Sequence, residues 1–226
     1  PVFDPPFAMT KVDRDTLSPQ GSASFAGAVF KWEYFANTSW SGTPLRTWYF
    51  RTNENGVVDY RADYLASGYT SDALYTNTDG YYQIPLGTVK ITEIRNSLGY
   101  TVLPDSLYCS ISADPSSISG ASVDWTAESW GYLMNMAVGN YGVYEPIDTT
   151  VLGGIMIQKE DGETGSTAPD GASFAGCEFT IYNRSDNAVK IGDTVAEPGE
   201  ACFVLTIDET GKASTGNVFP VGTYEV

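Results

Sequence analysis

The chain has 226 residues, of which 42% are apolar and 13% aromatic, so it can bury a core in one large or two modest domains and is not disordered. Its 12 basic and 28 acidic residues give a formal net charge of −16, which disfavours nucleic-acid and membrane-surface partners. The sequence contains no histidine, which excludes Ser-His-Asp and Cys-His catalysis and histidine-ligated metal sites within this chain, and we expect no cofactor.

Strand patterns separated by turns follow one another along the chain. Alternating apolar residues predict half-buried strands around Trp32 and Ile91, although Phe30 interrupts the first pattern. Asn55-Gly56 and Thr210-Gly211 are hairpin signals, and residues 60–66 form a short helix or turn at most. The composition favours Tyr, Val, Thr and Phe, which prefer strands. These features predict an all-β fold of two tandem small β-sandwiches, of the prealbumin or immunoglobulin type.

One stretch of the sequence occurs twice. Residues 23–30 read Ala-Ser-Phe-Ala-Gly-Ala-Val-Phe, and residues 172–179 read Ala-Ser-Phe-Ala-Gly-Cys-Glu-Phe. Four anchors in the same order indicate a duplication. The other three anchors match residues 11–15 with 159–163, residues 52–56 with 207–211, and residues 85–91 with 220–226.

The duplication divides the chain near residue 150. Residues 1–150 form the first predicted domain and residues 151–226 the second, which Gly153-Gly154 introduces after a short connector. A connector this short predicts two domains in a stiff line. The second copy stops two positions before the counterpart of Glu93, so we expect it to be incomplete at its C-terminal end.

Five motifs in a fixed order carry a family resemblance. They are Lys-x-Asp at residue 11, Phe-Ala-Gly-Ala-x-Phe at 25, Thr-x-Glu-Asn-Gly at 52, Leu-Gly-Thr-x-x-Ile-x-Glu at 86, and Gly99-Tyr100. Residues 9–100, and again 155–226, resemble the Cna-type B domain, also called SpaA-like or prealbumin-like, of Gram-positive surface adhesins and pilins. The resemblance implies a secreted, wall-attached protein, with no enzyme activity beyond autocatalysis, whose partners are other domains or subunits of a surface stalk or pilus.

The resemblance also implies an internal isopeptide bond. In the family, a first-strand lysine joins an asparagine, or sometimes an aspartate, of the last strand, and a buried glutamate promotes the reaction. Lys11 and Glu93 occupy the lysine and glutamate positions, but Tyr144 stands where the asparagine is expected. Asn140, four residues earlier on the same side of a continuous strand, is the first acceptor candidate. The weaker acceptor candidates are Asn135, Glu145 and Asp148.

The proposed chemistry is coherent without the family. A lysine amine must lose its proton to act as a nucleophile, and burial among apolar groups favours its neutral form. A carboxyl group buried beside it can hold a proton and polarise the amide that is attacked. In the second domain Lys159 is the equivalent lysine, and its glutamate and acceptor are both absent from this sequence.

The three cysteines form no metal-binding or redox pair. Cys177 and Cys202 lie 25 residues apart in one predicted domain, and an oxidising exterior would permit a disulfide between them. Two buried thiols are the alternative. Cys109 has no partner in its own domain.

Three functions compete at the level of sequence. A structural stalk or pilus segment accounts for the duplication and for the placement of Lys11 and Glu93. An adhesive module for a host glycan or matrix protein accounts for the aromatic residues of 34–50 and 125–144, which are otherwise core. A hydrolase would pair Glu93 with Asp124 or Glu128, and no pocket signature supports it.

Overall fold

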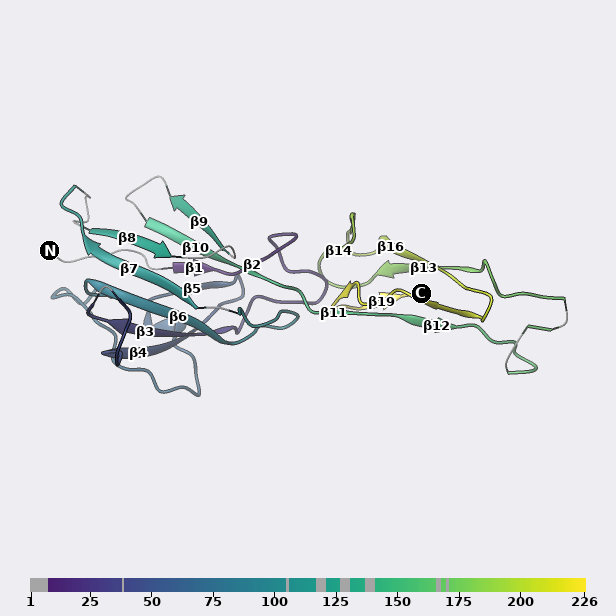
Figure 1. Cartoon of the computed structure of the whole chain (residues 1–226), viewed down its shortest axis with the longest axis horizontal. Helices are drawn as coiled ribbons and strands as arrows, with labels where there is room; N and C mark the ends of the chain where they lie inside the picture. The colour runs from purple at the N-terminus through teal and green to yellow at the C-terminus, as the bar shows by residue number, and fades with distance from the viewer. Residues whose placement is uncertain are drawn as a thin grey trace. The chain divides into compact units, whose positions relative to one another are not determined.

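The computed structural model describes residues 8–37, 39–104, 106–116, 121–126, 131–136, 141–165, 168–169 and 171–226. Among them are strands and a single 3-10 helix, η1 (Ala62–Tyr64), in the segment where a short helix or turn was predicted. The chain divides into two compact units, one of residues 1–14 and 24–149 and the other of residues 15–23 and 150–226 (Figure 1). The protein is all-β, built from tandem sandwiches.

In the described part of the chain, ten strands belong to the first unit and nine to the second. The first has β1 (Ala8–Thr10), β2 (Val12–Asp13), β3 (Val29–Phe35), β4 (Arg46–Arg51), β5 (Val57–Asp59), β6 (Gly87–Arg95), β7 (Leu107–Ala113), β8 (Ala121–Thr126), β9 (Gly131–Met136) and β10 (Tyr141–Asp148). The second has β11 (Leu152–Gly153), β12 (Met156–Gln158), β13 (Glu178–Asn183), β14 (Val189–Ile191), β15 (Thr194–Ala196), β16 (Ala201–Thr206), β17 (Lys212–Ser214), β18 (Phe219–Pro220) and β19 (Tyr224–Glu225).

Two sheets face each other in the first unit. One has the order β2-β10-β1-β5, with β9 added to β10, and the other is the antiparallel sheet β4-β3-β6-β7-β8. Strand β10 runs parallel to both β1 and β2, with Tyr144 opposite Met9 and Ile147 opposite Val12. The first and last strands of the unit therefore lie side by side, although more than a hundred residues separate them in the sequence.

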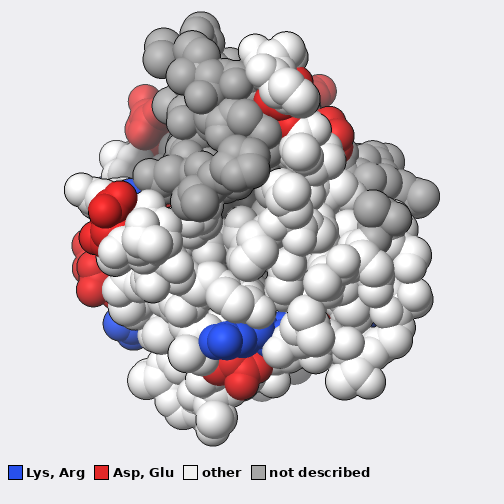
Figure 2. All heavy atoms as spheres, turned by 90° about the vertical axis from the view of Figure 1, so that its left-hand side faces the viewer, with Lys and Arg blue, Asp and Glu red and all other residues white. Residues whose placement is uncertain are grey.

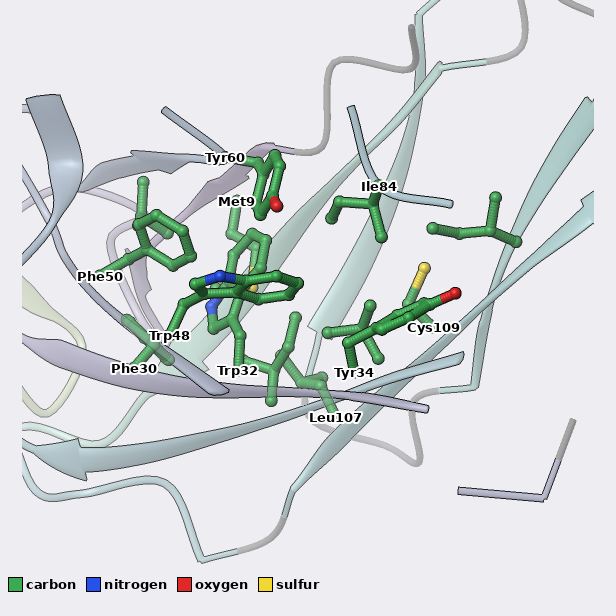
Figure 3. Packing of buried hydrophobic residues seen from close by; sticks show 14 of the residues in the cluster. Met9, Phe30, Trp32, Tyr34, Trp48, Phe50, Tyr60, Ile84, Leu107 and Cys109 are labelled. Atoms are coloured by element: carbon green, nitrogen blue, oxygen red, sulfur yellow. The ribbon is translucent and has the colours of Figure 1, made fainter. Parts of the chain in front are cut away.

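An aromatic core fills the space between these sheets (Figure 3). The ring centroids of Trp32 and Phe50 lie 4.8 Å apart, and those of Trp48 and Tyr60 lie 5.0 Å apart in an edge-to-face arrangement. Phe30 breaks the alternation because the β3–β6 register shifts between Val29 and Phe30. Such a bulge lets both neighbours be buried, which a regular strand would not allow.

Short sheets build the second unit. They are the three-stranded sheet β16-β13-β19 and the pairs β11-β18, β12-β17 and β14-β15. Its core is smaller and contains one fully buried aromatic residue, Phe219, among the described residues, together with aliphatic side chains such as Ile181 and Leu205.

Strand pairing repeats between the units as the sequence does. In each unit the first strand of the repeat pairs antiparallel with the strand after the Gly-terminated turn, and the strand after the Phe-Ala-Gly motif pairs on both of its edges. The corresponding partners are Met9↔Val58 with Ile157↔Ala213, Phe30↔Phe50 with Phe179↔Leu205, and Tyr34↔Val89 with Asn183↔Tyr224.

Candidate crosslink site

Lys11 lies between β1 and β2, and Glu93 lies in β6 of the facing sheet. Both residues are buried, with relative exposures of 1% and 3%. Lysine and glutamate are almost never fully buried unless they are paired. The two sheets therefore bring together the amine and the carboxyl group that the sequence singled out.

The pair is short and held on both sides. Lys11 Nζ lies 2.6 Å from Glu93 Oε1, and the side chains of both residues have no exposed surface. The backbone N–H of Leu103 donates to Glu93 Oε2 at 2.8 Å, which fixes the carboxylate from the loop that follows β6. The backbone N–H of Lys11 donates to the carbonyl oxygen of Gly56 at 2.9 Å, which anchors the lysine to the turn before β5.

Aromatic rings enclose the amine. Lys11 Nζ lies 5.9 Å from the ring centroids of both Phe30 and Tyr100, within the range of a cation–π interaction. Phe25 packs against Tyr100 with a centroid distance of 5.3 Å. The rings thereby shield the ion pair from water. Electrostatic interactions are stronger in such a dry environment than in water. Sequence reasoning marked Tyr100 within a motif but gave it no role at the site.

This arrangement can move a proton. When an ammonium donates to a carboxylate over 2.6 Å inside a dry site, transfer of that proton leaves a neutral amine and a carboxylic acid. The neutral amine is the nucleophilic form of lysine, and the carboxylic acid can donate a hydrogen bond to a carbonyl oxygen. The site thus contains the amine and the carboxyl group that amide formation needs, and the third group needed is the acceptor.

The acceptor candidates lie in and around β9 and β10. Asn140 is outside the described residues. Asn135 lies in β9, where its backbone pairs with Gly142 of β10. Strand β10 runs beside Lys11, and its Asp148 pairs with Asp13. Glu145 is in the same strand, opposite Tyr132 of β9.

Lys159 has the backbone position of Lys11. Its N–H donates to the carbonyl oxygen of Gly211 at 2.8 Å, as that of Lys11 does to Gly56. Its ammonium lies 5.5 Å from the ring centroid of Phe174, the counterpart of Phe25 in the repeat. Unlike Lys11, Lys159 is only half-buried.

The cysteines are all free thiols. Cys177 and Cys202 stand at opposite ends of the β13–β16 pair, since Ile207 bonds to Cys177 whereas Cys202 Sγ donates to the carbonyl oxygen of Ile181. Five residues along a strand span about 17 Å, which is too far for a disulfide. The disulfide that the sequence permitted is therefore not formed. Burial raises the pKa of the Cys202 and Cys109 thiols, which keeps both protonated.

Most aromatic residues of 34–50 belong to the core. Tyr34, Phe35 and Trp48 are buried, and Tyr49 stacks on Tyr69 with a centroid distance of 5.0 Å. Trp40 is the exception: it is 37% exposed and lies 4.6 Å from the ring of Tyr108. The side chains of β9 and β10 are outside the described part.

Other chemistry has little support at this site. Glu93 is engaged by Lys11 and Leu103, while Asp124 is exposed on β8, and Glu128 is outside the described residues. No group of three or more His, Cys, Asp or Glu among the described residues could hold a metal ion. No helix in the described part is long and apolar enough to cross a membrane. The face drawn in Figure 2 has scattered acidic groups and few basic ones.

The sequence matches no protein-family model, and a search of curated proteins finds no match either. The structure is similar to that of the Bacillus anthracis TIE protein, with 16% identity and a TM-score of 0.47 over 98% of this chain and 27% of the other. It is also similar to a streptococcal ancillary pilin (16% identity, TM-score 0.28, 96% of this chain, 51% of the other). A third similar structure is a minor pilin of Streptococcus agalactiae (12% identity, TM-score 0.30, 98% of this chain, 81% of the other). The chain thus spans 27% and 51% of the length of the first two similar chains.

Proposed function

We propose that this chain is a pilin-type structural module of a secreted Gram-positive surface protein, a stalk segment that carries load and acts on no external substrate. The buried pair of Lys11 and Glu93 is the observation that carries the proposal. A water-free ion pair between two sheets contributes little net stability, so its presence favours a chemical role. The duplicated sandwich supports a serial arrangement of such modules along a stalk.

The chemical role is an intramolecular isopeptide bond that stiffens the first unit. After Glu93 takes the proton of the amine, Lys11 Nζ attacks the side-chain carbonyl carbon of an acceptor on the last strand. A new C–N bond forms while the acceptor's C–N or C–O bond breaks, and the Lys11 ammonium gives up two protons in all. With an asparagine acceptor, one proton goes to the leaving NH2 group and the other ends on Glu93. With an aspartate carboxylate, both go through Glu93 to the leaving oxygen. An asparagine acceptor releases ammonia, and an aspartate acceptor releases water. Folding supplies the high effective concentration that the reaction needs.

The register of β10 helps to choose among acceptors. Met9 faces Tyr144 and Val12 faces Ile147, so Pro146 stands opposite Lys11. Asn140, the first candidate from the sequence, lies outside the described residues. Asp148 lies two positions after Pro146, or about 7 Å along the strand. This register supports Asp148 as the acceptor in the described part of β10.

Intact-protein mass spectrometry of the purified chain tests the bond. A Lys11–Asn140 bond lowers the mass by one ammonia, whereas a Lys11–Asp148 bond lowers it by one water. Fragmentation of a tryptic digest locates the branched peptide. We expect the Lys11→Met and Glu93→Gln variants to have the full mass of their sequences, and the Lys31→Met variant to keep the mass deficit. A wild-type chain with the full mass of its sequence would show that the isopeptide bond does not form.

An adhesive module remains the second candidate, and Trp40 favours it. This residue is partly exposed with a backbone φ of +39°, a conformation that a bulky residue rarely adopts. Its loop contains Asn37, Ser39 and Ser41, which hydrogen-bond to one another. An exposed indole beside hydroxyl groups suits a sugar ring. Binding to a glycan array that is lost in Trp40→Ala would support this function, and an array without hits would count against it.

A further inference from the structure

Residues 15–23 belong to the second unit, although the sequence places them inside the first. Both ends of this segment continue covalently into the first unit, at Arg14 and at Ser24. Within the second unit, residues Gln20–Ser22 lie against residues 187–190 and Val221. No sequence pattern had assigned a role to either stretch.

Backbone hydrogen bonds hold the segment. The N–H of Gly21 donates to the carbonyl oxygen of Ala188 at 3.0 Å, and the N–H of Ser22 donates to that of Val221 at 2.8 Å. In return, the carbonyl oxygen of Gly21 accepts from the backbone N–H of Asn187 at 3.0 Å and from its side-chain Nδ2 at 2.8 Å. The segment is thus held as a turn by backbone hydrogen bonds to two separate stretches of the second unit.

The side chain of Gln20 extends this recognition. Gln20 is only 2% exposed, and its Oε1 accepts from the backbone N–H of Lys190 at 2.9 Å. Its Nε2 donates to Thr150 Oγ1 at 3.4 Å. Lys190 lies in β14, whose other edge pairs with β15, so the glutamine amide satisfies a donor that an edge strand would otherwise turn to solvent.

The neighbouring position accepts only glycine. Gly21 has a φ of +60°, and a Cβ atom placed on it would lie 2.4 Å from the carbonyl oxygen of Val221 and 3.4 Å from Val189 Cγ1. The backbone conformation and the close approach both exclude a side chain. The site is therefore selective for the sequence Gln-Gly.

We infer that the second unit contains a binding site for the chain's own segment Gln20–Ser22, formed by residues 187–190 and Val221, and that this segment folds and unfolds with the second unit. The polypeptide then passes between the units at residues 14–15, 23–24 and 149–150. The segment is released when the second unit unfolds, whatever the state of the first. This inference does not depend on the crosslink or on the proposed function.

Native-state hydrogen exchange of the full-length chain at increasing denaturant tests the inference. We expect the amides of Gly21 and Ser22 to lose protection together with those of Asn183 and Ile207, which belong to the second unit. Loss of protection together with the first-unit amide of Thr52 would overturn it. So would exchange of Gly21 and Ser22 at the rate of an unstructured peptide.

A matched pair of variants tests the site itself. Gly21 and Gly192 both have a φ of +60° and lie in the second unit, but a Cβ on Gly192 would meet nothing within 4 Å. We expect Gly21→Ala to raise the exchange rates of the Asn187 and Lys190 amides by about tenfold or more relative to Gly192→Ala. Equal rates in the two variants would contradict a site that is selective for glycine at position 21.

Discussion

Lys11 and Glu93 each depend on the other for stability in the folded state. Both side chains are fully buried, and their charged atoms are 2.6 Å apart. Removing one member of such a pair leaves the other charge in a dry environment, which costs much more than the pair itself contributes. The surface pair of Lys31 and Glu33 differs, because both of its side chains retain contact with solvent.

We predict that the first unit of Glu93→Ala has a free energy of unfolding about 3–5 kcal/mol below that of Lys11→Met/Glu93→Leu. In Glu93→Ala, Lys11 is uncrosslinked and its buried charge is unpaired, whereas the double variant has neither the bond nor a buried charge. Urea denaturation followed by tryptophan fluorescence measures both variants. As a control, Glu33→Ala should cost less than about 1 kcal/mol. A difference between the two variants as small as the effect of the control would mean that the buried pair is not maintained in solution.

The sequence alone predicted the pairing of Lys11 with Glu93, but it did not predict the residues that surround the pair. Lys11 and Glu93 were singled out by their positions in repeated motifs. The hydrogen bond from Leu103 and the ring of Phe30 could not be predicted, because the first depends on a loop path and the second on a bulge. The disulfide failed for a related reason: spacing along the chain does not give the register that separates Cys177 from Cys202.

At the scale of elements, the duplication governs how the turns are built. Gly56 and Gly211 end equivalent turns with φ of +75° and +80°. A Cβ on Gly56 would lie 2.9 Å from the carbonyl oxygen of Lys11, and one on Gly211 would lie 3.0 Å from that of Lys159. Gly27 and Gly176 are a second equivalent pair, also with positive φ, whose Cβ positions meet nothing within 4 Å.

We predict that Gly56→Ala destabilises the first unit more than Gly27→Ala does. Both variants incur the cost of a left-handed alanine, about 1 kcal/mol, and Gly56→Ala must also displace the backbone of Lys11, at about 1–2 kcal/mol more. Gly211→Ala should exceed Gly176→Ala in the second unit in the same way. Thermal unfolding by calorimetry measures the four changes. Equal losses within either pair would show that the close approach to the lysine does not constrain the turn.

Sequence patterns predicted these elements well where periodicity or turn chemistry is local. The turns at Gly56 and Gly211, and the strands around Trp32 and Ile91, lie where they were expected. The two turns are not β-hairpins, however, because each one joins strands of different sheets: β4 pairs with β3 and β5 with β1, and β16 pairs with β13 and β17 with β12. The pairing of β10 with β1 could not be predicted from local sequence patterns, because it joins residues more than a hundred positions apart. The family pattern placed an asparagine at Tyr144, and the observed register instead brings Pro146 opposite Lys11.

For the whole molecule, the units share one plan but differ in what fills them. The first has a large aromatic core and a buried ion pair, whereas the second has a smaller aliphatic core and a half-buried lysine. The repeat was visible in the sequence because four motifs recur in order. The sequence did not reveal that residues 15–23 belong to the second unit, because this depends on backbone hydrogen bonds and on the close fit of Gly21.

The central claim, that a covalent bond from Lys11 lets the first unit carry load, is tested most directly by pulling the full-length chain from both ends in single-molecule force spectroscopy. The account predicts that the wild-type chain extends by unfolding of the second unit, while the residues of the first unit between Lys11 and its last strand stay folded. Lys11→Met should add the extension of the first unit, about 3.5 Å for each residue released. A wild-type chain that releases the same length as Lys11→Met would contradict the claim.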